Sequence, residues 1–335
     1  MRTKDNSSPE MRIADNADRS RVLPAGFLLG GLGVLAFSFS LPANKLAVAG
    51  IDAFTVTALR AALAGLLALA YLLVVRASVP GRGDLAALVC SGLGVVVGFP
   101  LFSSLALERI DSATAAVILG LLPALTATFA ALLAGERLPW LFWAATGAGA
   151  VVLIAYLLWA SPSGLSGFAL GWGHLWMFLA TVSAGFGYAV GGTVAKRIGG
   201  AQSISWSLVL LMPLSIPVAV VALIGGTVTL TTSVVAGMVY ITVISQFLGF
   251  FAWYGGLARG GIARIGQLQQ IQPLLTIVWS ALILGERPDA WIYLVGIVLG
   301  LLVWIAQRAR LRTTDVSPNT GDTSPSPRVE VALRH

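Results

Sequence analysis

The stretch of sequence that decides the fold occurs twice. Residues 112–139 read SATAAVILGLLPALTATFAALLAGERLP, and residues 262–289 read IARIGQLQQIQPLLTIVWSALILGERPD. In each stretch a proline, Pro123 or Pro273, stands twelve positions before a Gly-Glu-Arg triplet, so the two copies lie 150 residues apart. Repetition of this kind indicates a chain built from two copies of one structural unit.

The composition places both units in a membrane. Apolar residues make up 57% of the 335 residues and charged residues only 10%, whereas soluble domains carry about 25% charged residues. A soluble fold of this length could not bury so much apolar surface. The net charge of +7 does not indicate a nucleic-acid partner, because the basic residues lie in tails and short loops and are not gathered on one face with aromatic residues.

Ten apolar stretches have roughly the 20 residues that a helix needs to cross the hydrocarbon core of a bilayer. Backbone groups in lipid must be bonded internally, so each stretch is predicted to be a helix. Five fall in each repeat, and an odd number of crossings turns the second repeat upside down relative to the first. The approximate spans are 24–43, 53–75, 85–107, 112–134, 140–160, 170–193, 203–224, 233–257, 262–284 and 290–307.

The positively charged residues set the expected orientation. With ten crossings and both termini cytoplasmic, 17 of the 21 Lys and Arg residues fall on the cytoplasmic side, in accord with the positive-inside rule. Nine or eleven crossings would put the termini on opposite faces and scramble this bias. The predicted fold is an all-α integral membrane protein of ten transmembrane helices in two inverted five-helix repeats, multi-pass in the cell (inner) membrane.

The repeats are expected to be flanked by two polar tails. Residues 21–160 are predicted to form the first repeat and residues 168–310 the second. Residues 1–20 and 311–335 have few large apolar side chains, so burial could not offset the entropy of ordering them. Both tails are therefore predicted to be disordered.

The repeated segments resemble a known family. The segment from Leu105 through Ile154 contains the entry Ser112-Ala113-Thr114-Ala115-Ala116, Pro123 and the loop Gly135-Glu136-Arg137-Leu138-Pro139. It resembles the EamA-type repeat, and so does the stretch from Gly256 to Trp304. Over most of residues 22–310 the chain is thus similar to the drug/metabolite transporter superfamily. The resemblance implies a ten-helix bundle with helices 1–4 and 6–9 around a central cavity, helices 5 and 10 at the periphery, and transport of amino acids, drugs or other small metabolites.

Polar side chains inside apolar helices are costly and usually face the interior of the bundle. The ninth predicted helix carries Gln267, Gln269, Gln270 and Gln272 just before Pro273. Helical spacing pairs Gln267 with Gln270 and Gln269 with Gln272, and at most one of these faces need line a cavity. Their amides either bind a solute, because an amide both donates and accepts, or bond neighbouring helices and the carbonyl freed by the proline. Gln246 in the eighth helix has the same two interpretations.

Three basic residues are further candidates. Arg60 lies well inside the second helix. It could attract the carboxylate of a substrate, or it could extend to the interface or bond the end of a neighbouring helix, and we favour this structural role. Lys45 and Lys196 end the first and sixth helices, and inversion places them at opposite faces. They either gate the two mouths of a cavity or anchor their helices at the interface.

Aromatic residues and prolines complete the candidate site. Trp253 and Tyr254 on the eighth helix and Tyr188 on the sixth could form an aromatic wall that favours solutes with apolar side chains. Pro123 and Pro273 are matched hinge candidates for alternating access, although they could equally be static kinks.

The sequence contains little material for catalysis. No Asp or Glu lies in the middle of a predicted helix, Cys90 stands alone, and the two His residues show no metal-ligand spacing, so we expect no catalytic residues and no metal site. A nucleotide-binding loop is absent, so we expect no cofactor. We predict a secondary transporter, not an enzyme, that moves a small organic solute across the lipid bilayer, with export favoured over import or facilitated diffusion. A membrane enzyme and a scaffold are less favoured alternatives. The glycines Gly296 and Gly300 in the tenth helix indicate either the interface of a homodimer or packing against another helix within a monomer.

Overall fold

The computed structural model describes residues 9–135, 137–159, 171–226 and 228–315. These residues form helices and contain no β-strand, only an isolated bridge between Ile51 and Val228. The helices of the first repeat are α1 Pro9–Ser38, α2 Ser40–Val48, α3 Ala53–Val74, α4 Arg82–Gly92, the π-helix η1 Leu93–Gly98, α5 Phe99–Leu107, α6 Ser112–Leu119, α7 Leu122–Ala134 and α8 Trp140–Trp159.

The named elements of the second repeat are also helices. Its elements are α9 Trp172–Ile198, α10 Gly200–Leu210, α11 Met212–Gly225, α12 Thr232–Val239, the π-helix η3 Tyr240–Leu248, α13 Gly249–Gly260, α14 Ile262–Ile265, the 3-10 helix η4 Gly266–Ile271, α15 Gln272–Leu284 and α16 Ala290–Asp315.

Eight helices of the described chain are long and apolar enough to cross a membrane. The pair α10 and α11, bent by 55° after Leu210, brings the number to nine when it is taken as one span. The remaining predicted span, 262–284, is divided among α14, η4 and α15, and the 3-10 segment interrupts its α-helix. The multi-pass architecture is therefore confirmed, whereas the predicted span 262–284 is interrupted by a 3-10 segment and 203–224 by a bend.

The second parts of the two repeated stretches fold alike. Helices α7 and α15 each have a proline, Pro123 or Pro273, within their first two positions. Each ends at a glycine in the left-handed conformation, Gly135 with φ of 67° and Gly285 with φ of 66°. A proline costs nothing in the first helical turn and glycine readily adopts positive φ, so these residues fix the same start and end in both copies.

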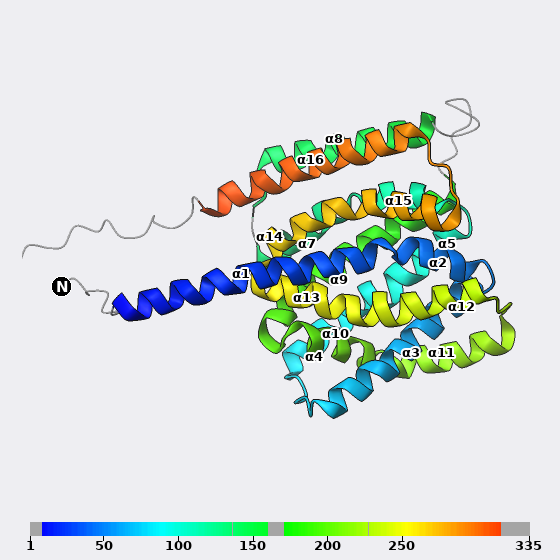
Figure 1. The fold of residues 1–335 in the computed structure, drawn as a ribbon, viewed down its shortest axis with the longest axis horizontal. Coiled ribbons are helices and arrows are strands. Elements are labelled where there is room, and N and C mark those ends of the chain that lie inside the picture. The colour runs from blue at the N-terminus through cyan, green and yellow to red at the C-terminus, as the bar shows by residue number, and fades with distance from the viewer. Residues whose placement is uncertain (1–8, 136, 160–170, 227, 316–335) are drawn as a thin grey trace, which may run out of the picture.

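Helices α8 and α16 pack against each other along one edge of the bundle (Figure 1). This arrangement agrees with the peripheral placement of the fifth and tenth helices that the resemblance implied. On α16, a Cβ atom added to Gly296 would lie 3.0 Å from Leu274 on α15, so this glycine faces a neighbouring helix of the same chain.

Helix α1 begins at Pro9 and α16 continues to Asp315, so residues 9–20 and 311–315 are helical although we expected disorder there. Residues 10–23 contain no Gly or Pro to end the helix, and Pro9 suits a first helical position. Residues 1–8 and 316–335 lie outside the described residues. The start of α1 and the end of α16 lie at the same end of the bundle (Figure 1).

Candidate functional site

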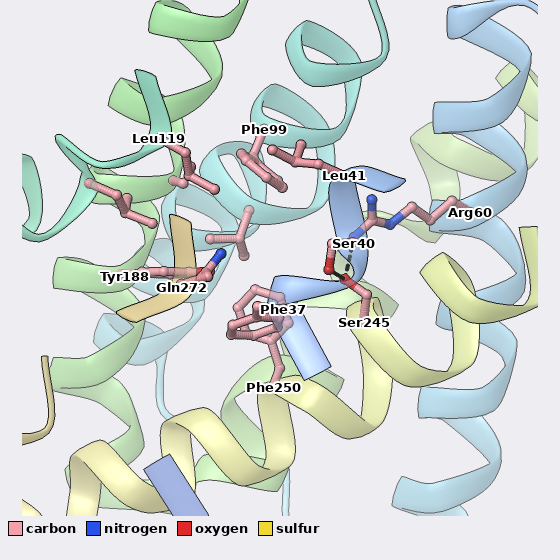
Figure 2. Close-up of a pocket in the computed structure, with 13 residues that line it drawn as sticks. Phe37, Ser40, Leu41, Arg60, Phe99, Leu119, Tyr188, Ser245, Phe250 and Gln272 are labelled. Atoms are coloured by element: carbon pink, nitrogen blue, oxygen red, sulfur yellow. Dashed lines mark hydrogen bonds between the residues drawn. The ribbon is translucent and has the colours of Figure 1, made fainter. Parts of the chain in front are cut away.

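A cavity lies where helices of the two repeats meet (Figure 2). Its volume is about 10 Å³, close to the least space that one water molecule needs. The structure is therefore closed around the cavity, and an organic solute could enter only if the surrounding helices moved apart. The lining residues are Phe37, Ser40, Leu41, Arg60, Val95, Phe99, Leu119 and Leu122 from the first repeat and Ala184, Tyr188, Ser245, Phe250 and Gln272 from the second.

Two π-helical segments each contribute a residue to the cavity lining. The segments η1 and η3 contain Val95 and Ser245, which lie 150 positions apart and both line the cavity. The Nε2 atom of Gln246 donates to the carbonyl oxygen of Val95 over 3.2 Å, so the two segments are bonded to each other. A π-turn inserts an extra residue into a helix and is frequent at functional sites.

A break between α1 and α2 exposes another side of the cavity. Pro42 has no N–H, which frees the carbonyl of Ser38 four residues earlier. The hydroxyl of Thr276 on α15 donates to that carbonyl over 2.8 Å, and Nε1 of Trp279 donates to the Ser38 hydroxyl over 3.0 Å. Side chains of the second repeat thus satisfy polar groups of Ser38 at this break. Ser40, the first residue of α2, lines the cavity.

Arg60 lies at one side of the cavity with its side chain 2% exposed. Its Nη2 atom donates to the hydroxyl of Ser245 over 3.2 Å, and this hydroxyl lies 2.7 Å from that of Ser40 (Figure 2). The buried Nε atom has no hydrogen-bond partner. Arg60 therefore neither extends to the interface nor bonds the end of a helix, which are the structural roles that we favoured from the sequence.

Aromatic rings form a wall beside this polar group. The ring of Phe37 lies 5.0 Å from that of Phe250 and 6.1 Å from that of Tyr188. Trp253 is fully buried, does not line the cavity and lies 6.3 Å from Phe37, so it supports the wall from behind. Tyr254 is also outside the lining, where its hydroxyl lies 3.2 Å from that of Ser91.

The glutamines of the ninth span do not lie where an α-helix would put them. Gln272 lines the cavity at the side opposite Arg60, and its Oε1 atom is buried without a partner (Figure 2). Gln267 and Gln270 are outside the lining, as is Gln269, which is 2% exposed and has no partner for either polar atom of its amide. The 3-10 helix η4 has three residues per turn and so rotates these side chains away from their α-helical positions.

The remaining predicted residues lie apart from the cavity. Gln246 is fully buried and bonds Val95, and its Oε1 atom has no partner. Lys45 donates from Nζ to the carbonyls of Leu107 over 2.6 Å and Ile110 over 3.0 Å, which ties α2 to the chain after α5. Lys196 is exposed in the last turn of α9.

The prolines have different surroundings. The carbonyl of Pro123 accepts a 2.8 Å hydrogen bond from Nε2 of Gln307 on α16. Pro273 lies at the junction of η4 and α15, directly after Gln272, and 3.7 Å from where a Cβ atom on Gly120 would stand.

Glu286 joins the two repeats at one end of the bundle. Its Oε1 atom accepts from the backbone N–H of Ser112 over 3.0 Å and from the Ser112 hydroxyl over 2.9 Å, and Oε2 accepts from the N–H of Ala113 over 3.0 Å. The Ser112 hydroxyl also lies 2.7 Å from that of Ser280 on α15. The carboxylate thus caps the N-terminus of α6, where a helix favours negative charge. Glu136, its counterpart, lies outside the described residues.

The cavity offers binding groups and little catalytic chemistry. Its thirteen described lining residues include no Asp, Glu, His or Cys. In the described part of the chain, no group of three or more such residues could hold a metal ion.

Sequence reasoning missed Ser40, Ser245, Phe99 and Phe250 as lining residues. Ser40 and Ser245 are small polar residues that apolar helices often carry for packing, so composition does not single them out. The sequence contains one signal for these positions, the spacing of 150 residues between the repeats, which aligns Ser245 with Val95 and Gln272 with Leu122.

Comparisons with known proteins agree with this architecture. The EamA-like transporter family matches residues 24–160 and again residues 171–306. An uncharacterized transporter, YdeK of Bacillus subtilis (strain 168), is 38% identical over 283 residues, covering 84% of this chain and 97% of the relative. A crystal structure of 20% sequence identity matches with a TM-score of 0.57 over 87% of this chain and 99% of that one, which supports the fold alone. With two copies of the family's unit along its length, this chain belongs to the EamA-like transporter family.

Proposed function

We propose that this protein is a secondary transporter that moves a small organic solute by alternating access through the cavity between its two repeats. The observation that carries the proposal is the lining of that cavity, which comes from helices of both matched units. A site at the junction of two inverted repeats is typical of secondary transporters. We propose export of an amino acid, drug or related metabolite, with import or facilitated diffusion as the alternative directions.

The proposed topology has ten crossings, with both termini cytoplasmic and the chain in the cell membrane. The broken stretch α14, η4 and α15 supplies one crossing and the bent pair α10 and α11 another. The common position of the ends of α1 and α16 supports an even number of crossings (Figure 1). In this topology Glu286 lies at the outer end of the bundle and Gly260 at the cytoplasmic end.

Alternating access requires a closure at each end of the cavity. At the proposed outer end, Glu286 and Ser280 bond Ser112 across the two repeats. At the proposed cytoplasmic end, α1 and α13 touch through glycines, because a Cβ atom on Gly256 would lie only 2.6 Å from the backbone nitrogen of Gly30. We propose that these contacts open in turn, and that the small cavity is the occluded state between the two openings.

The experiment is solute flux in proteoliposomes. We expect at least one solute from a panel of amino acids and small metabolites to cross faster than in protein-free liposomes. Gln272→Ala, which removes a lining amide, should slow that flux several-fold. Gln202→Ala, on α10 and outside the lining, should leave it near the wild-type rate. Flux of no solute in the panel, or equal flux in both variants, would contradict the proposal.

A further inference from the structure

Among the residues that the structure describes, no carboxylate is paired with the charge of Arg60. Among the described residues, the ion pairs are Glu108 with Arg109 and Asp84 with Arg197, and neither involves Arg60. The fourteen Asp and Glu residues of the chain lie in tails, in loops or at span ends. The nearest along α3 is Asp52, whose carboxylate caps that helix by accepting from Phe54 and Thr55.

An isolated buried cation is costly because it loses its hydration without gaining a partner. The guanidinium of Arg60 has one hydrogen bond, to a neutral hydroxyl, and its Nε atom has none. It lies seven residues inside α3, about 10 Å from the start of the helix at 1.5 Å per residue. A cation that is buried at this depth with a single neutral hydrogen-bond partner is placed to receive a counter-charge from outside the chain.

Two serine hydroxyls lie beside the cation. A guanidinium can only donate, so the Ser245 hydroxyl accepts from Arg60 and keeps its own proton to donate. The Ser40 hydroxyl lies 2.7 Å from it, and one of the two serines donates to the other in this contact. Ser40 also lies 3.4 Å from the carbonyl of Ala36, to which it can donate, so the two serines together offer one donor to a ligand. This hydroxyl donor and a guanidinium on one side of the cavity suit the two oxygens of a carboxylate (Figure 2).

The opposite side of the cavity suits an uncharged body. Phe37, Phe99 and Phe250 supply apolar walls, and the polar groups on that side, the amide of Gln272 and the phenol of Tyr188, carry no charge (Figure 2). The described lining therefore carries one positive charge and no negative charge. A ligand with a single negative charge would balance it.

On the basis of the proposed transport function, we infer that the cavity binds a small carboxylate monoanion with an apolar or aromatic body, and that Arg60, Ser245 and Ser40 hold its carboxylate. A neutral ligand would leave the buried cation unbalanced. A dianion such as a phosphate monoester would leave one buried negative charge without a counter-charge.

The test uses the purified full-length protein and matched probes. The probes are 3-phenylpropanoate and 4-methylpentanoate, each with its neutral amide. Dissociation constants come from calorimetry in detergent, and thermal unfolding with each probe provides a second readout. We expect at least one carboxylate to bind about 10- to 100-fold more tightly than its amide, the range that hydrogen bonds to a charged group provide.

Four variants test which side chains produce the preference for the carboxylate. Arg60→Gln should remove the preference for the carboxylate, and Arg60→Lys should retain part of it. Ser245→Ala, which keeps the charge and removes one donor, should weaken carboxylate binding several-fold. Arg82→Gln, an exposed cation on α4, should bind as the wild type does. Without ligand, Arg60→Gln should unfold at or above the wild-type temperature, whereas a structural arginine would destabilise the fold when replaced.

Equal affinity for acid and amide would overturn the inference, and so would absence of carboxylate binding or a preference that survives Arg60→Gln. These failures differ from failure of the proposed function. Flux of neutral or cationic solutes that depends on Gln272 and not on Arg60 would leave the transporter intact and refute only its anion preference.

Discussion

Replacement of Glu286 should reveal how firmly the two repeats are joined at one end. In Glu286→Ala, Ser112 loses two hydrogen bonds and Ala113 loses one. Hydrogen bonds to a charged group contribute about 1.5–3 kcal/mol each. Glu286 is half-buried, so water can reach part of the freed helix end, and loss of an N-terminal cap costs about 0.5–2 kcal/mol. We expect a total loss of about 2–4 kcal/mol in the free energy of unfolding, between these bounds.

Thermal unfolding in detergent measures this loss. For a chain of this size about 1 kcal/mol corresponds to roughly 2 °C, so Glu286→Ala should unfold about 4–8 °C below the wild type. Glu286→Gln keeps the shape of the side chain but places an NH₂ group where one acceptor oxygen stood. Its unfolding temperature should therefore fall by about half as much as that of Glu286→Ala.

The matched control is Asp84→Asn, which removes the carboxylate that accepts from Nε of Arg197 over 2.9 Å at the surface. A surface ion pair contributes about 0–1 kcal/mol, so this variant should lose less than about 2 °C. If Glu286→Ala lost no more stability than Asp84→Asn, the cap on α6 would not be a structural link between the repeats.

Three further substitutions test the packing with the same unfolding assay. Gly256→Ala should destabilise the protein by about 1–3 kcal/mol, because the added Cβ would stand 2.6 Å from a backbone nitrogen. The control Gly31→Ala, whose Cβ would meet nothing within 4 Å, should be neutral or stabilise by up to about 1 kcal/mol. Equal effects of the two substitutions would refute the close helix contact. Lys45→Met should lower the free energy of unfolding by about 1–3 kcal/mol, because two hydrogen bonds to carbonyls are lost. The exposed control Lys196→Met should lower it by less than about 0.5 kcal/mol. The reverse order would contradict the assigned contacts. Thr276→Val should cost about 1–3 kcal/mol by leaving a buried carbonyl without a donor, and an unchanged unfolding temperature would show that this carbonyl has another partner.

Most of the architecture could be predicted because it depends on local rules. The proline and glycine of each repeated stretch set helix starts and ends in both copies, and the φ angles of Gly135 and Gly285 differ by one degree. Apolar length predicted the spans because lipid leaves the backbone few alternatives to a helix. The course of α1 before residue 21 was not predicted, because polar composition alone does not end a helix and residues 10–23 contain no Gly or Pro.

The site was harder to predict because it depends on departures from regular helix geometry. In the π-helix η3, Ser245 lies in the lining and Gln246 does not. Gln270 belongs to the 3-10 helix η4 and lies outside the lining, whereas Gln272, the first residue of α15, lies in it. Such departures reflect tertiary packing, as in the bond from Gln246 to Val95, and leave no periodic signal in the sequence. The surroundings of Arg60 likewise involve Ser245, 185 residues away in the chain.

A reversible crosslink between the repeats tests alternating access most directly. The hydroxyls of Ser112 and Ser280 lie 2.7 Å apart, so cysteines at these positions stand close to the spacing that a disulfide needs. Ser112→Cys and Ser280→Cys, combined with Cys90→Ser to remove the native thiol, should give proteoliposomes whose solute flux stops on oxidation and returns on reduction. Flux that continues unchanged while the crosslink is verified as complete would contradict the claim that the two repeats must separate at this end to move a solute.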